Sequence, residues 1–110
     1  MRLPGRERAV VDIAKLRDYC LNPFHPRGRY KARVFAASLR LTQADAKFLR
    51  RESLRAARAG DARKRHAYEY GERFTIDFEI ALHGRRAAVR STWIVRRADQ
   101  SPGLTTRYIL

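Results

Sequence analysis

One short segment of the chain combines residue types that could act on a phosphate group. Residues 25–31 read His-Pro-Arg-Gly-Arg-Tyr-Lys, which places His25 in a constrained loop and Lys31 in the first turn of the helix that follows. The first turn of a helix offers free backbone N–H groups and the positive end of the helix dipole, so it can bind a phosphate. Arg29 and Lys31 would add positive charge there. Histidine titrates near neutral pH and is suited to proton transfer.

This combination suits the cleavage of RNA by its own ribose 2′-hydroxyl. In that reaction a base removes the 2′ proton, cations or hydrogen-bond donors stabilise the charged phosphorane, and an acid protonates the leaving 5′ oxygen, with no metal required. A structural interpretation competes with it, in which His25 caps or terminates a helix and Lys31 is a solvated helix residue. Spacing alone favours the structural interpretation, because a lone histidine beside basic residues is a weak signal.

The charge of the chain indicates the kind of partner it meets. Its 110 residues include 25 Lys and Arg against 11 Asp and Glu, a formal net charge of +14. A field of that sign attracts polyanions, so nucleic acid is the default partner, and the length predicts one domain over residues 1–110. Two alternatives stay open: a charge that serves solubility or reflects arginine-rich codon usage, and an acidic protein partner that covers a basic face.

Several classes of protein are not expected. No stretch approaches the roughly 18 apolar residues of a membrane span, and residues 1–7 lack the apolar region of a signal peptide, so we expect a cytoplasmic protein without a membrane partner. Cys20 is alone, which excludes an internal disulfide and a zinc ribbon. The three histidines are not spaced as metal ligands, and no P-loop or Rossmann glycine fingerprint is present, so we expect neither a metal nor a cofactor.

The periodicity of apolar residues predicts three helices in the first half of the chain. Asp12 is a good N-cap for a helix over residues 12–21, and a loop with two prolines follows over residues 22–28. A second apolar stripe predicts a helix over residues 29–40. Residues 42–45, Thr-Gln-Ala-Asp, resemble a capping box that opens a third helix, which Gly60 ends.

The second half of the chain predicts an antiparallel sheet. Apolar residues alternate with polar ones over residues 74–82, and a turn over residues 83–86 leads to a returning strand over residues 87–96. Residues 104–110 predict a third strand, and residues 67–70, after a polar run over 61–66, predict a short fourth. The fold class is therefore α+β, with two or three N-terminal helices packed on one face of a three- to four-stranded antiparallel sheet.

Such a sheet leaves its second face open. We expect Phe74, Phe78 and Trp93 in the core, and polar side chains on the open face, where an RNA strand could lie. An ordinary solvated face is the alternative. The candidates for this face are Thr75, Asp77, Glu79, Arg90 and Thr92, together with some of Thr105, Thr106, Arg107 and Tyr108.

Four segments of the chain resemble a known family. They are residues 21–35, 70–74, 89–95 and 104–108, and together they extend the resemblance over nearly the whole sequence. The family consists of small bacterial domains without an assigned function. Its members stand alone, often beside an antitoxin-like partner, or form the C-terminal tip of large polymorphic toxins.

The resemblance implies the ribonuclease superfold that includes barnase, EndoU, colicin D and RelE. It implies that His25 acts as base or acid, that Lys31 supplies charge to the phosphate, that Arg90 stabilises the phosphorane, and that Thr106 and Tyr108 position the substrate. This chain is more basic than its expected relatives, which favours contact with nucleic acid. The side chains that we expect to contact RNA are those of Arg27, Arg29, Arg33 and Thr92.

Three hypotheses follow from these observations. The first is a metal-independent endoribonuclease of the toxin type, acting on structured RNA such as tRNA or on translated mRNA. The second is a non-catalytic nucleic-acid-binding module, and the third is an interaction domain for an acidic antitoxin or immunity protein. The convergence of His25, Lys31, Arg90 and Thr106 around one phosphate would favour the first hypothesis.

Overall fold

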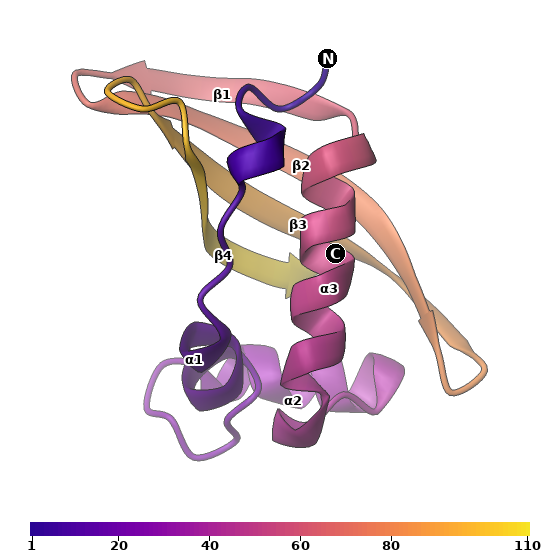
Figure 1. Ribbon diagram of the computed structural model, residues 1–110. Coiled ribbons are helices and arrows are strands. Elements are labelled where there is room, and N and C mark those ends of the chain that lie inside the picture. Colours follow the sequence, from indigo (N-terminus) through magenta and orange to yellow (C-terminus); the bar gives the residue numbers. More distant parts are fainter.

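The computed structural model describes residues 1–110 and places the helices before the sheet in the chain (Figure 1). The predicted α+β fold is confirmed. A short 3₁₀ turn (Arg6–Arg8) precedes α1 (Ile13–Lys15), which continues into a π-helical turn (Leu16–Cys20). Helix α2 (Arg29–Leu39), a 3₁₀ turn (Gln43–Asp45) and α3 (Ala46–Ala59) follow. The strands are β1 (Ala62–Tyr68), β2 (Gly71–Leu82), β3 (Arg85–Arg96) and β4 (Pro102–Ile109).

The helices begin where the sequence predicts them. Asp12 caps α1, since its Oδ1 accepts a hydrogen bond from the Ala14 N–H at 3.0 Å. The Asp45 carboxylate accepts one from the Thr42 N–H at 2.9 Å, which forms the predicted capping box before α3. The last turn of the first helix is π-helical, which the apolar spacing did not predict. None of the helices is long and apolar enough to cross a membrane.

The four strands pair in the order β1-β2-β3-β4, each antiparallel to the next. His83 and Gly84 form the turn between β2 and β3, and both have positive φ angles, 54° and 70°. That turn geometry matches the twist of the two strands that it joins. A bulge lies where β4 pairs with Thr92 and Trp93 of β3, and it inserts Thr105 as an extra residue into β4.

Strand β1 corrects one prediction. The sequence predicts a polar run over residues 61–66 and a short strand over 67–70, whereas β1 begins at Ala62 and ends at Tyr68. Only Ala62 is buried in it, so no alternation of apolar residues reveals the strand. Backbone pairing with β2 is sufficient to form β1, because an edge strand hydrogen-bonds to only one neighbouring strand and does not need a buried face of its own.

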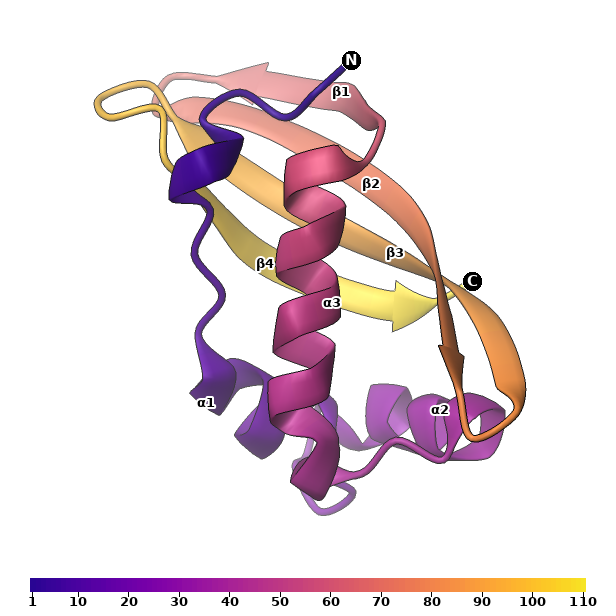
Figure 2. The ribbon, with the colours of Figure 1, turned by 45° about the vertical axis from the view of Figure 1, so that its right-hand side comes forward.

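The core lies between α3 and one face of the sheet. Figure 2 shows α3 crossing that face, with α1 and α2 gathered toward the end of β4. Along β3 the predicted alternation is confirmed. Val89, Trp93 and Val95 are buried, and the alternating residues Arg90, Thr92 and Ile94 point to the other face. The Trp93 indole N–H donates to Ser91 Oγ at 2.9 Å, which satisfies both polar groups inside the core. Of the predicted core aromatics, only Phe78 is partly exposed.

Candidate functional site

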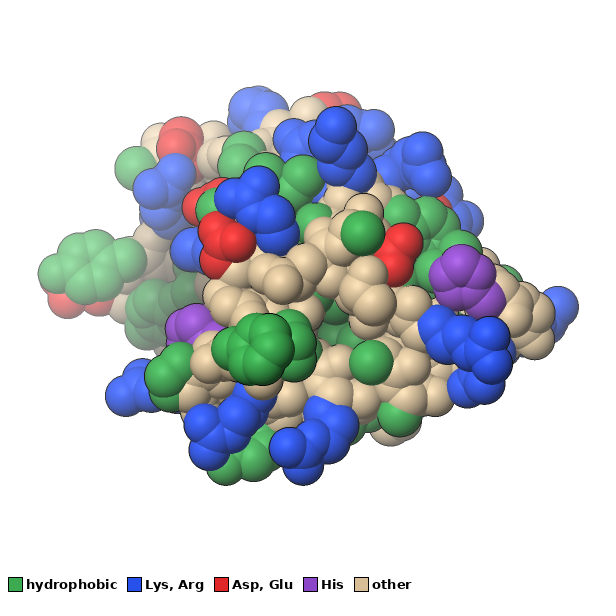
Figure 3. All heavy atoms as spheres, turned by 90° about the horizontal axis from the view of Figure 1, so that it is seen from below, with side chains coloured by type: hydrophobic (Ala, Val, Ile, Leu, Met, Phe, Trp, Pro, Cys, Tyr) green, Lys and Arg blue, Asp and Glu red, His purple; other side chains and the backbone are tan.

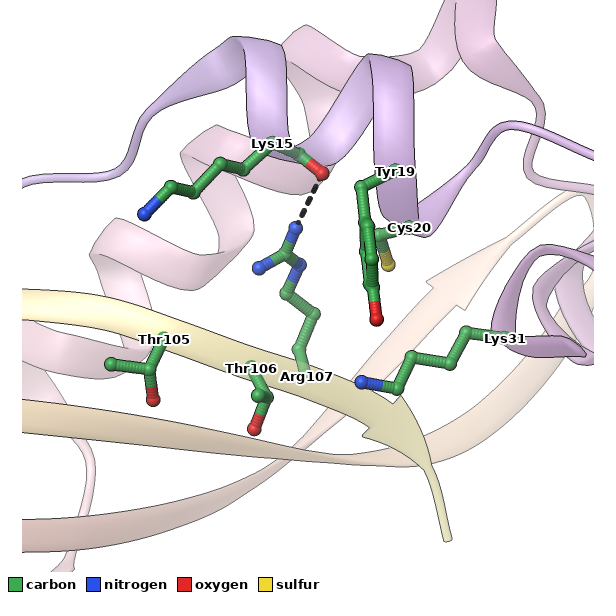
Figure 4. A pocket seen from close by; sticks show the side chains of 7 residues that line it. All are labelled: Lys15, Tyr19, Cys20, Lys31, Thr105, Thr106 and Arg107. Carbon is green, nitrogen blue, oxygen red and sulfur yellow. Dashed lines mark hydrogen bonds between the residues drawn. The ribbon is translucent and has the colours of Figure 1, made fainter. Parts of the chain in front are cut away.

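A pocket of about 240 Å³ opens between the helical end of the molecule and the outer edge of β4 (Figure 4). Three segments build it: the first helix with its π-helical turn, the first turn of α2, and the middle of β4. Pockets for drug-sized ligands measure roughly 300–1,000 Å³, so this pocket suits a group such as a phosphodiester better than a large cofactor. The lining residues are Lys15, Tyr19, Cys20, Lys31, Thr105, Thr106 and Arg107.

Arg107 is the most unusual member of this pocket. Its register opposite Ser91 turns it toward the helices, and only 3% of its surface is exposed. One guanidinium nitrogen, Nη2, donates to the Lys15 carbonyl at 3.0 Å, while the buried Nε has no hydrogen-bond partner. Burial lowers the pKa of Arg107, and Cys20 and Tyr19 oppose that shift. The side chain remains cationic at neutral pH, because arginine does not lose its proton in proteins.

The charge of Arg107 has no counterpart in the fold. None of the salt bridges includes it. A buried charge without an opposite charge is strongly unfavourable, since the transfer of an ion from water into a protein interior costs on the order of several kcal/mol. The pocket around Arg107 therefore has a place for an anion that the chain itself does not supply.

Two lysines add to the positive charge of the pocket. Figure 4 shows the Lys31 ammonium and the Tyr19 hydroxyl both pointing toward β4, on the side of Arg107 and Thr106. Lys31 Nζ lies 5.7 Å from the centroid of the Tyr19 ring, within the range of a cation–π contact. Lys15 lines the opposite wall. In Figure 3, which views the end of the molecule where α1 and α2 lie, Lys and Arg side chains outnumber Asp and Glu.

The loop before α2 fixes the geometry of the pocket. A Cβ on Gly28 would overlap the Tyr19 carbonyl oxygen, so only glycine allows this close contact between the loop and the π-helical turn. His25 Nδ1 accepts hydrogen bonds from the N–H groups of Arg27, at 3.0 Å, and Gly28, at 2.9 Å. The His25 ring also packs edge-on against Tyr19, with the centroids 4.5 Å apart. These contacts hold Tyr19 and the start of α2, with Lys31, in one arrangement.

The same contacts constrain what His25 can do. A neutral imidazole that accepts hydrogen bonds at Nδ1 carries its proton on Nε2, so the ring can donate a hydrogen bond from Nε2. For His25 to take up a proton at Nδ1, its two bonds from the loop N–H groups must open. His25 therefore has a structural role in the loop, and it lies beside the pocket through its contact with Tyr19.

The predicted catalytic residues divide between two neighbouring places. Lys31 and Thr106 both line the pocket. Arg90 lies instead on the open face of the sheet, paired in register with Tyr108 of β4 and with Asp77 of β2. Its Nε and Nη2 donate to the two Asp77 carboxylate oxygens, both at 2.8 Å. This ion pair raises the pKa of Arg90 and lowers that of Asp77, so the Arg90 charge is already compensated.

The side chains predicted to contact RNA lie outside the pocket. Arg27 and Arg33 are exposed near the start of α2. Arg29 donates to the Tyr30 hydroxyl at 2.8 Å, and its guanidinium lies over that ring. Thr92 is on the open face, next to Thr106 in the register. No three His, Cys, Asp or Glu side chains come together in a way that could hold a metal ion.

Sequence reasoning did not identify Arg107, Tyr19 or Lys15 as parts of one site. Consecutive strand residues point to opposite faces, but only the pairing register and the bulge decide that Arg107, and not Thr106, faces the helices. Tyr19 fits the apolar stripe of the first helix and is therefore easily assigned to the core. An arginine within an otherwise apolar buried pattern is the signal that could have drawn attention to residue 107.

Comparisons with known proteins agree with the fold and identify the family. No curated protein matches the chain. A chain of the contact-dependent growth inhibition toxin–immunity protein complex from Klebsiella pneumoniae 342 superimposes with a TM-score of 0.65 at 16% identity, covering 96% of both chains. At that identity the likeness concerns the fold. The family model of a domain of unknown function, DUF6883, matches residues 2–110, so the chain belongs to the DUF6883 family.

Proposed function

We propose that the chain is a ribonuclease domain of the toxin type, which cleaves RNA by attack of a ribose 2′-hydroxyl on the adjacent phosphodiester in the pocket at β4. The observation that carries the proposal is the buried, uncompensated guanidinium of Arg107 beside Lys31 and Thr106. A phosphodiester is an anion of fitting size. The phosphorane carries more negative charge than the diester, so fixed cations bind the transition state more strongly than the substrate.

Each pocket residue has a role in this proposal. Arg107 and Lys31 stabilise the negative charge of the phosphorane, while the hydroxyls of Thr106 and Tyr19 orient the phosphate by hydrogen bonds. Proton transfer is assigned to His25, whose ring packs edge-on against Tyr19. For His25 to act as base or acid, the hydrogen bonds at its Nδ1 must open when RNA binds.

Residues of the open face have a role next to the reacting phosphate. Arg90 and Tyr108 form the next pair on the same face of the sheet as Thr106, two residues along the strands. In the proposal they contact the RNA strand beside the scissile phosphate. The order of helices before a four-stranded antiparallel sheet fits the ribonuclease superfold that the sequence resembles.

An assay on RNA in the presence of EDTA tests the proposal. Purified protein is incubated with total tRNA and a synthetic single-stranded RNA, alongside Arg107→Met, Lys31→Ala and His25→Ala. Arg58→Gln serves as the matched control, because it removes one positive charge from the exposed surface of α3. We expect discrete fragments with 2′,3′-cyclic phosphate ends from the wild type and the control. We expect little or no cleavage from the three pocket variants.

The substrate itself provides a second control. A synthetic RNA with a single 2′-deoxynucleotide at the cleavage position should resist cleavage there, since it lacks the attacking hydroxyl. Cleavage at that position, or undiminished cleavage by Arg107→Met, would contradict the mechanism. Intact tRNA and synthetic RNA after prolonged incubation with the wild type would count against the ribonuclease itself.

A second candidate function is the binding of an acidic immunity-type protein. Two observations favour it: the net charge of +14 and the shared fold with a chain from a toxin–immunity protein complex. The test is co-expression with the protein encoded next to this chain. We expect a stable complex that masks the pocket and loses affinity in Lys31→Ala, whereas a complex insensitive to this change would place the partner elsewhere.

A further inference from the structure

A row of side chains crosses the open face of the sheet from the pocket to the far edge. Thr106 of β4 pairs with Thr92 of β3, Thr92 pairs with Thr75 of β2, and Thr75 pairs with Arg63 of β1. Directly paired residues of antiparallel strands point to the same face, so all four share the open face. The row begins at a residue that lines the pocket.

The far end of this row is basic and aromatic. His66 pairs with Arg73, and the His66 and Tyr68 rings lie 5.7 Å apart at an angle of 31°. Arg65 Nε donates to Thr75 Oγ1 at 2.8 Å, so its guanidinium covers the row. We call this group the β1 patch; its members are Arg63, Arg65, His66, Tyr68 and Arg73.

The charges of the β1 patch are largely available. None of its arginines takes part in a salt bridge. Acidic groups close to the patch have other partners: Asp61 pairs with the N-terminal ammonium group, Asp77 with Arg90, and Glu72 with Lys64. The three arginines and His66 are exposed, and Tyr68 is half-buried. The patch therefore offers cations for a phosphate backbone beside rings on which bases can stack.

The spacing of the strands sets the distance from the pocket to Arg63 at the end of the row, and His66 and Tyr68 lie further along β1, opposite Arg73 and Gly71. Neighbouring strands lie about 4.8 Å apart, so β4 and β1 are separated by about 14 Å. A stacked nucleic-acid strand advances about 3.4 Å per nucleotide, so about four nucleotides span this distance, and fewer if the strand is extended. Between the two ends, the half-buried Thr92 hydroxyl can hydrogen-bond to a phosphate or a sugar without selecting a base, whereas Thr75 is buried and bonded to Arg65.

We infer that the β1 patch binds single-stranded RNA a few nucleotides away from the phosphate held in the pocket. The inference rests on the proposed function of the pocket and adds the substrate class: an RNA with an unpaired segment long enough to reach β1. Stacking on His66 and Tyr68 requires bases that are free of a partner strand, which a duplex does not offer.

Binding of an RNA that cannot be cleaved tests this inference separately from catalysis. We would measure fluorescence anisotropy with fully 2′-O-methylated RNA of 3 and 12 nucleotides, using the wild type, Arg63→Gln/Arg73→Gln, and Tyr68→Leu. The control, Arg51→Gln/Arg58→Gln, removes the same charge from α3. All four arginines are exposed, so the fold should be kept, and circular dichroism checks it.

The expected results depend on the length of the RNA. The double arginine variant should bind the 12-mer about tenfold more weakly or worse, with a salt dependence reduced by about 0.7 per lost phosphate contact. Tyr68→Leu should weaken it about fivefold or more, because stacking contributes about 1–3 kcal/mol per base. Binding of the 3-mer should change little, and the α3 control should bind both RNAs almost as the wild type does.

Three results of the binding experiment would overturn the inference: equal losses for the β1 and α3 variants, loss of 3-mer binding in the β1 variants, or equal affinity of the wild type for a 12-base-pair duplex. The first would mean that only net charge matters. Wild-type binding that needs the β1 patch without cleavage of unmodified RNA would uphold the inference and contradict the ribonuclease. Cleavage of long RNA at the wild-type rate by the β1 variants would support the ribonuclease and contradict the inference.

Discussion

Arg90 and Arg107 lie on adjacent strands of the sheet, yet the fold treats their charges in opposite ways. Arg90 is on the open face, its side chain is 30% exposed, and it forms a two-pronged pair with the Asp77 carboxylate. Arg107 is 3% exposed and has a backbone carbonyl as its hydrogen-bond partner. The residue type alone makes both arginines candidates, but the neighbouring charges decide which of them can still bind an anion. That comparison points to Arg107 as the centre of the site.

The comparison also separates stability from function. A guanidinium that is buried without a carboxylate should weaken the fold, and a side chain retained at such a cost is typical of functional sites. Arg90 has the reverse profile, since its pair with Asp77 makes a small contribution to stability. The two arginines should therefore respond differently when each is replaced.

The largest effect is expected from Arg107→Met. Cleavage should fall about 10²- to 10³-fold, the usual loss for one group that stabilises a transition state, whereas Arg90→Gln should lose tenfold or less. The melting temperature of Arg107→Met should stay the same or rise, because methionine fills the space without a buried charge. Kinetics and thermal denaturation check both statements.

Inorganic phosphate gives this comparison a control that does not depend on catalysis. An anion that binds only the folded protein stabilises it by about 2.7 kcal/mol at 100 times its dissociation constant. Phosphate should raise the melting temperature of the wild type and of Arg90→Gln but not of Arg107→Met. A similar rise in all three proteins would mean that the anion binds somewhere other than Arg107.

A smaller loss of cleavage is expected from Gly28→Ala, which disturbs the pocket around Arg107 and not the surroundings of Arg90. The added Cβ would overlap the Tyr19 carbonyl oxygen, so the loop and the π-helical turn must separate. Overpacking of this kind costs about 1–3 kcal/mol, and the displacement of Tyr19 and Lys31 should lower cleavage about tenfold or more.

Gly103→Ala is the matched control for this change. No atom lies within 4 Å of a Cβ at Gly103, and its φ is not in the left-handed region, so the variant should melt and cleave like the wild type. Denaturant unfolding and cleavage rates measure the difference between the two variants. Equal behaviour of Gly28→Ala and Gly103→Ala would show that the loop contact does not set the pocket geometry.

The sequence was sufficient to predict the helices and the central hairpin, because their signals are local. Asp12 and Asp45 cap helices by contacts within a few residues, and the alternation around Trp93 follows directly from the pleat. Strand β1 was missed over most of its length because an exposed edge strand has no apolar pattern. The strand forms because it pairs with β2, and no local pattern in the sequence of β1 encodes that pairing.

The candidate site was only half predictable for a related reason. Lys31 and Thr106 were nominated by type and position, and both line the pocket. Arg107 was not chosen over Arg90, because the bulge at Thr105 and the absence of a carboxylate partner are tertiary facts. The roles of the nominated residues in binding and cleaving RNA stay predictions that the experiments above test.

A gain in RNA affinity is expected when Arg90, like Arg107, has no carboxylate partner. Asp77→Asn removes the carboxylate that compensates Arg90 and leaves the side-chain volume nearly unchanged. Single-stranded RNA should then bind about three- to tenfold more tightly, since one more cation on the open face is free to contact a phosphate. Anisotropy with the 2′-O-methylated 12-mer measures this. Glu7→Gln, which makes the same change of charge at an exposed position of the N-terminal 3₁₀ turn, should produce a smaller gain.

The smallest effect concerns acid stability, and it depends on the pair of Arg90 with Asp77. The Arg90 guanidinium holds the pKa of Asp77 below its ordinary value of about 3.9. A depressed carboxyl pKa contributes stability that is present above the ordinary pKa and is lost as the pH falls through the folded value. Both side chains are partly exposed, so solvent screening keeps this contribution small.

The wild type should therefore melt slightly above Asp77→Asn at pH 7, and the difference should shrink as the pH falls below about 4. Arg107 has no carboxylate partner, so Arg107→Met should show no comparable change over the same range. Thermal denaturation of the three proteins in low salt between pH 2.5 and 7 separates these cases. A wild-type advantage over Asp77→Asn that persists unchanged to the lowest pH would mean that the carboxylate stabilises the fold by packing, and the electrostatic contrast between the two arginines would lose its support.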